Sequence, residues 1–294
     1  MIIISIGGGL GNQMFEYALY YKLKKLYSDQ VIKLDIHYAF PIAHNGFEVE
    51  RIFSLQSEKA SKEEVERLID RLLVGEHENR ICSLIREVRQ RIGIKKKSYL
   101  LQRDYSAYYP EFFNLDKNQS YYLYGPFCNS LYFRDMKQEI QQLFTFPPLD
   151  EKNEKWRDII NQNTCVSIHI RRGDYIPLNM GLCTEEYYKN AASYIREKLR
   201  GQKLVFLAFT DDVDYVKEKF GWLENLYIVE GNSGTDSFRD MQLMSLCDHN
   251  INANSTFSFW GAYLNRNPEK IVVVPKEPVH LCKYPFTSDG WIML

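Results

Sequence analysis

The stretch that decides the fold is residues 164–175, which read TCVSIHIRRGDY. Its first seven residues alternate β-branched apolar side chains with small or polar ones, which is typical of a buried β-strand. The strand runs into Arg171-Arg172-Gly173-Asp174, where glycine permits a turn that a side chain would hinder. In open α/β sheets, ligands bind beyond the carboxyl ends of the strands. Since a guanidinium matches two phosphate oxygens at once, the stretch predicts a strand that ends in a phosphate-binding turn.

The phase of the strand places its polar side chains. If the chain stays extended, His169 and Arg171 lie on one face and Arg172 points the other way. A solvated surface turn is the alternative interpretation of an arginine pair. The apolar strand before the pair and the histidine in phase with Arg171 favour the anion site.

The composition is that of an ordinary globular protein. The chain has 294 residues, 45% hydrophobic and 26% charged, with a net charge of −1. This length suits two domains or one large one, and the balanced charge gives no global attraction to nucleic acid. Six cysteines form no CxxC pair or zinc-ligand spacing, and no signal peptide or membrane-length apolar run is found. We therefore expect no metal, no nucleic-acid partner and a reducing, cytoplasmic location.

The amino-terminal segment predicts a strand, a glycine loop and a helix. An apolar run over 1–6 is followed by Gly7-Gly8-Gly9-Leu10-Gly11-Asn12 and then by an amphipathic pattern. Such a loop brings bare backbone close to a phosphate or sugar. A dinucleotide fingerprint requires glycine where Asn12 stands, which disfavours a nicotinamide dehydrogenase. Asn12 is either the N-cap of the helix or a ligand contact.

A helical hairpin is expected within residues 57–97. A capping box starts at Ser61, and two apolar stripes end at Gly75 and Gly93. The basic stretch 86–97 is favoured as a solvated face, and contact with an acidic membrane surface is the alternative. Before the hairpin, a short strand over 31–34 ends in Asp35, with His37 nearby.

The domain boundary is expected at residue 150. Two prolines and a polar run over 145–153 interrupt helix and strand patterns. This gives an N-terminal domain over 1–150 and a C-terminal domain over 151–294. In the second domain we expect strands at 164–170, 203–209, 226–230, 249–253 and 271–274, and helices at 184–199, 212–220, 236–247 and 257–265. Strands spaced by helices predict a parallel, Rossmann-like sheet.

Polar groups follow three of these strands. Besides the arginine turn, Asp211 and Asp212 follow the second strand, where carboxylates accept hydrogen bonds from a base or ribose. The fourth strand leads through Asn254 into a helix that starts near Ser255. The first backbone amides of this helix can bind a phosphate. Each group has a simple capping role as its alternative. Together they are complementary to a nucleotide diphosphate.

The chain resembles glycosyltransferase family 11, the α-1,2-fucosyltransferases of bacterial type. The matching segments are GGLGNQMF (8–15), YGPF (124–127), HIRRGDY (169–175), FTDD (209–212) and DHNINANSTFSFWGAYL (248–264). They cover nearly the whole chain in the expected order. A more distant likeness joins it to protein O-fucosyltransferases and α-1,6-fucosyltransferases. Departures are Phe259, where many relatives have tryptophan, and Tyr215-Val216, where a Trp-Cys pair is usual.

The resemblance implies a GT-B-like α/β fold, with two Rossmann-like domains whose parallel sheets face a cleft and the hairpin inserted in the first. It implies an inverting, metal-independent transfer of L-fucose from GDP-β-L-fucose to a terminal galactose of a glycan, with no cofactor. The second domain would hold the donor, and the acceptor would approach from the first. A fucosyltransferase of other linkage, and a nucleotide- or glycan-binding module without turnover, are the alternatives.

The resemblance and the chemistry of the transfer together suggest roles for individual residues. Arg171 would bind the β-phosphate, assisted by amides at Ser255, Thr256 and Phe257, and Asn12 would face the fucose. The donor would further contact Gly8, Gly9, Gly11, His169, Arg172, Asp211, Asp212 and Asn254. Asp174, Asp35 and His37 are candidates for the general base, and a salt bridge from Asp174 to Arg172 is the favoured alternative for Asp174. Asp212-Val213-Asp214 fits a DxD pattern, so a metal-dependent transferase is a rival interpretation.

Overall fold

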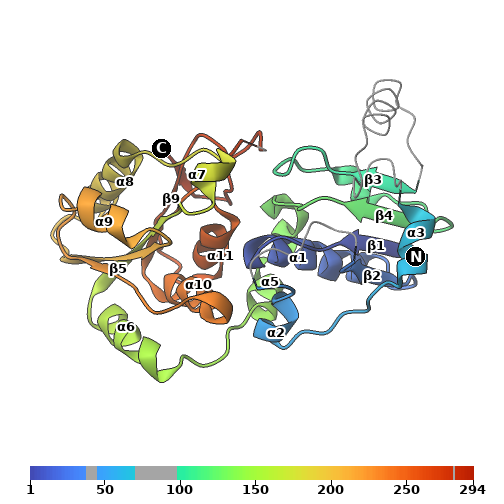
Figure 1. Cartoon of the computed structure of the whole chain (residues 1–294), viewed down its shortest axis with the longest axis horizontal. Coiled ribbons are helices and arrows are strands. Elements are labelled where there is room, and N and C mark those ends of the chain that lie inside the picture. Colours follow the sequence, from blue (N-terminus) through green and yellow to red (C-terminus); the bar gives the residue numbers. More distant parts are fainter. Residues whose placement is uncertain (38–44, 70–97, 281) are drawn as a thin grey trace. The chain divides into compact units, whose positions relative to one another are not determined.

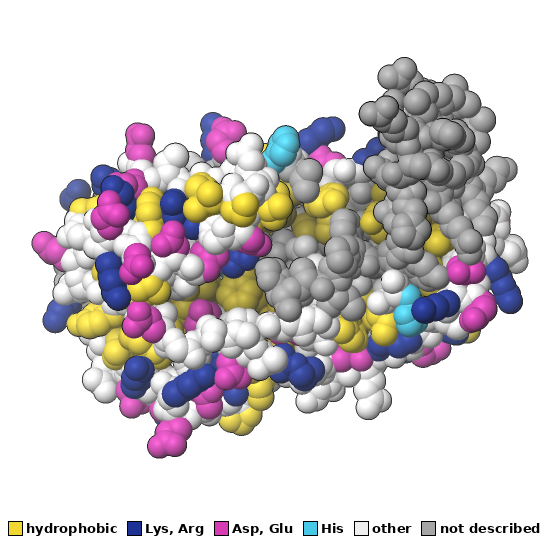
Figure 2. Space-filling model, viewed as in Figure 1, with side chains coloured by type: hydrophobic (Ala, Val, Ile, Leu, Met, Phe, Trp, Pro, Cys, Tyr) yellow, Lys and Arg dark blue, Asp and Glu magenta, His cyan; other side chains and the backbone are white. Residues whose placement is uncertain are grey.

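The computed structural model describes residues 1–37, 45–69, 98–280 and 282–294, and they form two compact units (Figure 1). Unit 1 comprises Met1–Phe127 and Leu131–Phe133; unit 2 comprises Cys128–Ser130 and Arg134–Leu294. No helix in the described ranges combines the length and the apolar character needed to cross a membrane. On the face shown in Figure 2, basic and acidic side chains are interspersed.

Unit 1 contains a four-stranded sheet in the order β2-β1-β4-β3, and each neighbouring pair is parallel. Its strands are β1 (Ile2–Ser5), β2 (Ile32–Asp35), β3 (Tyr99–Leu101) and β4 (Tyr121–Tyr124). Its helices are α1 (Leu10–Leu26), α2 (Val49–Phe53) and α3 (Lys62–Leu68), with a 3-10 turn at Pro110–Phe113. Ile3 packs with Val65 of α3 and Tyr122 of β4, so an inner strand is covered by a helix as a parallel sheet requires.

The predicted capping box is confirmed at the start of α3. Ser61 accepts a hydrogen bond from the Glu64 amide, and the Glu64 carboxylate accepts one from the Ser61 amide. The rest of the predicted hairpin, residues 70–97 with the end of the first apolar stripe and the basic stretch 86–97, lies outside the described residues.

Unit 2 contains a six-stranded parallel sheet in the order β10-β9-β8-β5-β6-β7. Its strands are β5 (Thr164–Ile170), β6 (Leu204–Thr210), β7 (Leu226–Ile228), β8 (His249–Ile251), β9 (Val272–Val274) and β10 (Ile292–Met293). Its helices are α5 (Lys137–Leu143), α6 (Glu151–Gln162), α7 (Tyr175–Leu178), α8 (Glu185–Lys198), α9 (Val213–Lys219), α10 (Phe238–Leu246) and α11 (Thr256–Leu264), with 3-10 turns at Arg134–Met136 and Gly234–Asp236. A further 3-10 turn at Ser130–Tyr132 spans both units.

β5 is an inner strand of this sheet, between β8 and β6, and both of its faces are covered. Val166 and Ile168 pack in one cluster with Ala191 of α8. Cys165 packs in another cluster with Trp156 of α6 and Leu243 of α10. The expected strand at 164–170 is therefore confirmed residue for residue, and the alternation of its side chains separates the two helix layers. The other expected strands and helices of this half are also present.

The units divide ahead of the expected boundary at residue 150. Phe144 packs edge-on against Trp260 with ring centroids 5.1 Å apart, and Gln141 Nε2 donates to the Tyr263 carbonyl. Gln242 Nε2 donates to the Pro147 carbonyl at 2.7 Å. α5 and the proline stretch thus pack on unit 2, whereas the sequence pattern placed them at the end of the first domain. Prolines indicate only where a helix or strand is interrupted. The unit to which a segment belongs depends on contacts with residues distant in the sequence, which the prolines do not indicate.

Candidate functional site

The strand order brings three polar segments to one edge of the unit 2 sheet. β5 lies between β6 and β8, and all three run parallel. Arg171 follows the end of β5, Asp211 follows the end of β6, and Ser255 comes shortly after β8. The three segments that the sequence marked as polar strand ends are therefore spatial neighbours.

Arg171 is held between two carboxylates. Its Nη2 lies 2.7 Å from Asp174 Oδ1 and its Nη1 lies 2.9 Å from Asp211 Oδ2. The side chain remains 25% exposed, and its guanidinium carbon lies 5.5 Å from the centre of the Tyr175 ring. A guanidinium has five N–H groups, so two ion pairs orient it and leave donors for an anion. The arrangement is a fixed cation at the carboxyl edge of the sheet.

The expected salt bridge from Asp174 to Arg172 is wrong, because Asp174 pairs with Arg171 instead. Asp174 immediately precedes α7, at the end of the short turn that Arg171 opens after β5. This turn brings the two residues, three apart in the sequence, into contact.

The Arg172 side chain is held by contacts with other residues of the protein. Its Nε donates to Asp212 Oδ2 at 2.9 Å, and its guanidinium stacks 3.6 Å above the Tyr215 ring. Asp212 also caps α9 by accepting a hydrogen bond from the Tyr215 amide at 3.0 Å. That bond first, and the Arg172 side chain second, hold the pKa of Asp212 below its usual value. The capping alternative for Asp212 is confirmed.

Asp211 organises the turn around it. Its Oδ1 accepts a hydrogen bond from the Arg172 amide at 2.8 Å, while its Oδ2 pairs with Arg171. A Cβ added to Gly173 would lie 2.9 Å from Asp211 Oδ2. A side chain at position 173 would therefore displace the Asp211 carboxylate from these two contacts. The sequence offered Asp211 and Asp212 as acceptors for a base or ribose, and the structure shows Asp211 bound to the arginine turn.

His169 is a buried polar side chain with an unused atom. The residue is 6% exposed, its ring centroid lies 5.8 Å from that of Phe257, and its Nδ1 has no hydrogen-bond partner. Burial first, and the Arg171 charge second, lower the pKa of His169 to about 3. The imidazole is therefore neutral near pH 7. A neutral imidazole next to Arg171 can accept one hydrogen bond and donate another, which suits a nucleoside or sugar hydroxyl.

The start of α11 completes this edge. Ser255 Oγ accepts a hydrogen bond from the Phe257 amide at 3.2 Å, so its predicted capping role is confirmed. Ser255 directly precedes Thr256, the first helical residue, and Asn254 and Ser255 are both buried. The partial positive charge of a helix start favours a bound anion.

Three tyrosines support the backbone of this edge. The Tyr188 hydroxyl donates to the His169 carbonyl at 3.0 Å, and the Tyr187 hydroxyl donates to the Asn252 carbonyl at 2.6 Å. Tyr175 likewise donates to the Asn254 carbonyl at 2.8 Å. Sequence reasoning missed these roles, because an aromatic pair in a helix indicates only a buried helix face.

In unit 1 the glycine loop is tightly wound at Gly8. Gly8 has φ of +68°, and an added Cβ would lie 2.7 Å from Asn12 Nδ2. α1 begins at Leu10 after Gly9, and no side chain caps it. The capping role considered for Asn12 is therefore wrong, since the helix starts two residues earlier. The Asn12 amide instead lies against the glycine loop.

Two further side chains fasten this loop, and the sequence analysis did not single them out. Gln13 Nε2 donates to the carbonyls of Gly8 at 2.9 Å and Gly46 at 2.8 Å. Glu16 Oε2 accepts a hydrogen bond from the Gly7 amide at 2.8 Å. Glu16 is fully buried, and burial raises its pKa well above the usual value. A glutamate within an apolar helix face is the signal that marks such a residue.

The two candidate bases of unit 1 differ in exposure. Asp35 is fully buried at the end of β2; its Oδ2 accepts from the Tyr122 hydroxyl at 2.6 Å and its Oδ1 from the His37 amide at 2.7 Å. The His37 residue is exposed. Asp35 is in register with Ser5, the last residue of β1, and the glycine loop follows β1. Asp35 and His37 therefore lie near the start of that loop.

Within the described ranges, no three His, Cys, Asp or Glu side chains are grouped so as to hold a metal ion. Asp214 of the DxD pattern is exposed and lies within α9.

Known proteins resemble this chain in sequence and in fold. The "Alpha-1,2-colitosyltransferase" of Escherichia coli is 30% identical over 100% of this chain and 99% of that protein. The "O-antigen biosynthesis glycosyltransferase WbnK" of Escherichia coli is 33% identical over 98% of this chain and 99% of that protein. A solved mutant of Arabidopsis thaliana FUT1 in complex with GDP matches with a TM-score of 0.51 at 13% identity, over 96% of this chain and 71% of that one.

The fold is GT-B-like, as expected, with parallel sheets in two Rossmann-like units. The family model described as "Glycosyl transferase family 11" matches residues 1–283. Together with the two relatives that align over their whole length, this match shows that the protein is a glycosyltransferase and belongs to glycosyl transferase family 11.

Proposed function

We propose that the protein transfers L-fucose from GDP-β-L-fucose to the 2-hydroxyl of a terminal β-galactose, with inversion and without a metal ion. The observation that carries this is the oriented guanidinium of Arg171 beside the helix start at Ser255. Family membership supports the reaction class, and the α-1,2 linkage in the name of the colitosyltransferase relative supports the linkage.

The leaving group decides what the chain must supply. As the bond between the fucose anomeric carbon and GDP breaks, negative charge grows on the β-phosphate and the sugar becomes oxocarbenium-like. Arg171 offers a fixed positive charge to that phosphate, and the first amides of α11 add the helix dipole. Because the two carboxylates already orient the guanidinium, little reorganisation is needed when the charge appears.

Inversion requires the acceptor oxygen to attack the face opposite the departing GDP, so a β-linked donor gives an α-linked product. A base takes the acceptor proton as the new bond forms. Asp174 is bound to Arg171, which favours a positioning role for it. Asp35 and His37 are the remaining candidates, and the exposed His37 is the more accessible of the two.

Transfer of colitose is a second candidate function, favoured by the name of the relative "Alpha-1,2-colitosyltransferase", which aligns over its whole length. Colitose lacks the 3-hydroxyl of fucose, so the two donors differ in one hydrogen-bonding group.

The test is transfer to lactose from GDP-fucose and from GDP-colitose in separate assays. The account predicts a larger kcat/KM with GDP-fucose and an α-1,2-linked product by NMR. A larger value with GDP-colitose would support the second function. Nucleotide binding without product from any galactoside would indicate a binding module.

Metal removal is expected to leave the rate unchanged. A fixed guanidinium takes the role that a divalent cation serves in other transferases. The measurement is transfer to lactose after incubation with EDTA and desalting, compared with the untreated protein. Loss of activity that added Mn²⁺ restores would contradict the proposal and revive the DxD interpretation.

A further inference from the structure

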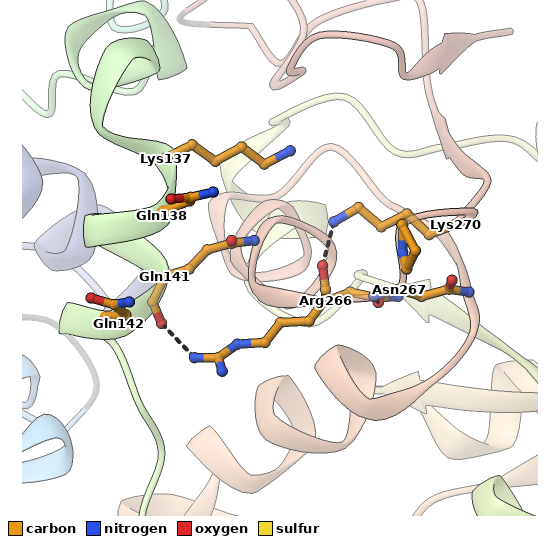
Figure 3. Close-up of a pocket in the computed structure, with 9 residues that line it drawn as sticks. Lys137, Gln138, Gln141, Gln142, Arg266, Asn267 and Lys270 are labelled. Carbon is orange, nitrogen blue, oxygen red and sulfur yellow. Dashed lines mark hydrogen bonds between the residues drawn. The ribbon is translucent and has the colours of Figure 1, made fainter.

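A basic pocket of about 350 Å³ lies in unit 2, away from the arginine turn. It is formed by α5 and by the segment that joins α11 to β9 (Figure 3). Arg171 follows the end of β5, whereas this segment leads into the start of β9. In a parallel sheet all strands start on one side of the sheet and end on the opposite side. The pocket therefore lies near the amino ends of the strands, whereas the candidate donor site lies at their carboxyl ends.

The pocket is lined by cations and amides. Its lining residues are Lys137, Gln138, Gln141, Gln142, Asn265, Arg266, Asn267, Pro268 and Lys270. None of them is acidic. Figure 3 shows Lys137 and Gln141 projecting from α5 toward the segment that carries Arg266 and Lys270. Side chains from two separate segments thus converge on one space.

The three cationic side chains of the pocket differ in how many hydrogen bonds hold them. Lys270 Nζ donates to the Ala262 and Asn265 carbonyls, both at 2.6 Å, and so binds the carboxyl end of α11. Arg266 Nη2 donates to the Gln141 carbonyl at 3.3 Å, which joins the two walls. Lys137 makes no ion pair or hydrogen bond to any residue that the structure describes. Lys270 has one N–H left, and most of the Arg266 guanidinium is unused.

The charges in this pocket are not balanced within it. Burial first, and the Lys137 charge second, lower the pKa of Lys270 to about 8. A bound anion would remove that repulsion. A carboxylate carries one negative charge, while a phosphate or diphosphate carries two or more and has several acceptor oxygens for the amides. The pocket therefore suits a multivalent phosphate better than a carboxylate.

We propose that the pocket of Lys137, Arg266 and Lys270 binds a phosphate or diphosphate group, as a site distinct from the one for the donor nucleotide. The group can come from a free phosphate or from the headgroup of an acidic lipid. Both present the same oxygens to the same cations, so the experiment separates the sources.

The first test is calorimetric titration of inorganic pyrophosphate at low ionic strength. The full chain carries Arg171→Ala throughout, so that the candidate donor site does not dominate the signal. Lys137→Gln with Arg266→Gln is compared with Lys203→Gln, an exposed lysine in the same unit. We expect binding that weakens at least tenfold in the double variant and stays unchanged in Lys203→Gln. Equal affinity in all three proteins, or no binding in any, would overturn the proposal.

The second test is cosedimentation with phosphatidylglycerol vesicles and with phosphatidylcholine vesicles. Binding to the anionic vesicles that the double variant loses assigns the site to a lipid headgroup. Pyrophosphate binding without cosedimentation assigns it to a soluble phosphate. Lys270 is left intact because it binds the end of α11, and both substituted side chains are exposed, so the variants keep the fold.

Discussion

Replacing Arg171 by lysine is expected to lower the rate of transfer by about 10²–10³-fold, which corresponds to about 3–4 kcal/mol of lost transition-state stabilisation. A lysine keeps the positive charge but has no planar fork. A lysine that paired with both Asp174 and Asp211, in place of the guanidinium contacts at 2.7 and 2.9 Å, would keep a single N–H for a phosphate, whereas the guanidinium keeps three. The loss should fall on kcat, because the charge on the leaving phosphate grows in the transition state.

The measurement is kcat and KM for GDP-fucose with saturating lactose. Arg200→Lys is the matched control, since it makes the same exchange at an exposed arginine of unit 2. Wild-type turnover by Arg171→Lys, with the control also normal, would contradict the role given to the guanidinium fork.

Removing the Asp211 carboxylate is expected to lower kcat/KM by about 10–100-fold, smaller than the loss from Arg171 itself. Asp211→Ala takes away the acceptor of the Arg172 amide and one of the two ion pairs that orient Arg171. Both contacts organise the turn that ends β5. Asp211→Asn keeps an oxygen for the Arg172 amide but loses the charge, so it should lie between Ala and the wild type.

Asp214→Ala is the control for Asp211, because it removes a nearby exposed carboxylate that belongs to the DxD pattern. Wild-type activity is expected for it. If Asp214→Ala were as damaging as Asp211→Ala, the ion-pair account of Asp211 would fail. Thermal unfolding of each variant separates a loss of activity from a loss of fold.

The sheet of unit 2 could be predicted because its signals are local. Alternation along 164–170 predicted β5, and Ser255 predicted the start of α11. Glycine spacing also marked the loop before α1. Which partner a charged side chain chooses is not local in this way. For Asp174 a salt bridge to Arg172 was the favoured alternative to a role as base, yet it pairs with Arg171 across the turn that leads into α7.

Helix starts and domain limits were harder to predict. Asn12 was considered as an N-cap, but α1 begins at Leu10 after an uncapped glycine. The polar run after Pro148 was taken as a break, whereas Asp150 caps α6 there by accepting from the Asn153 amide. The tyrosines that support the strand ends could not be predicted, because each reaches a carbonyl far along the chain.

The most direct measurement of the central claim is a crystal structure of the protein with GDP. The account predicts that the β-phosphate lies within hydrogen-bond distance of the Arg171 guanidinium, close to the first amides of α11 after Ser255. GDP bound elsewhere, with the Arg171 side chain turned toward bulk solvent, would contradict it.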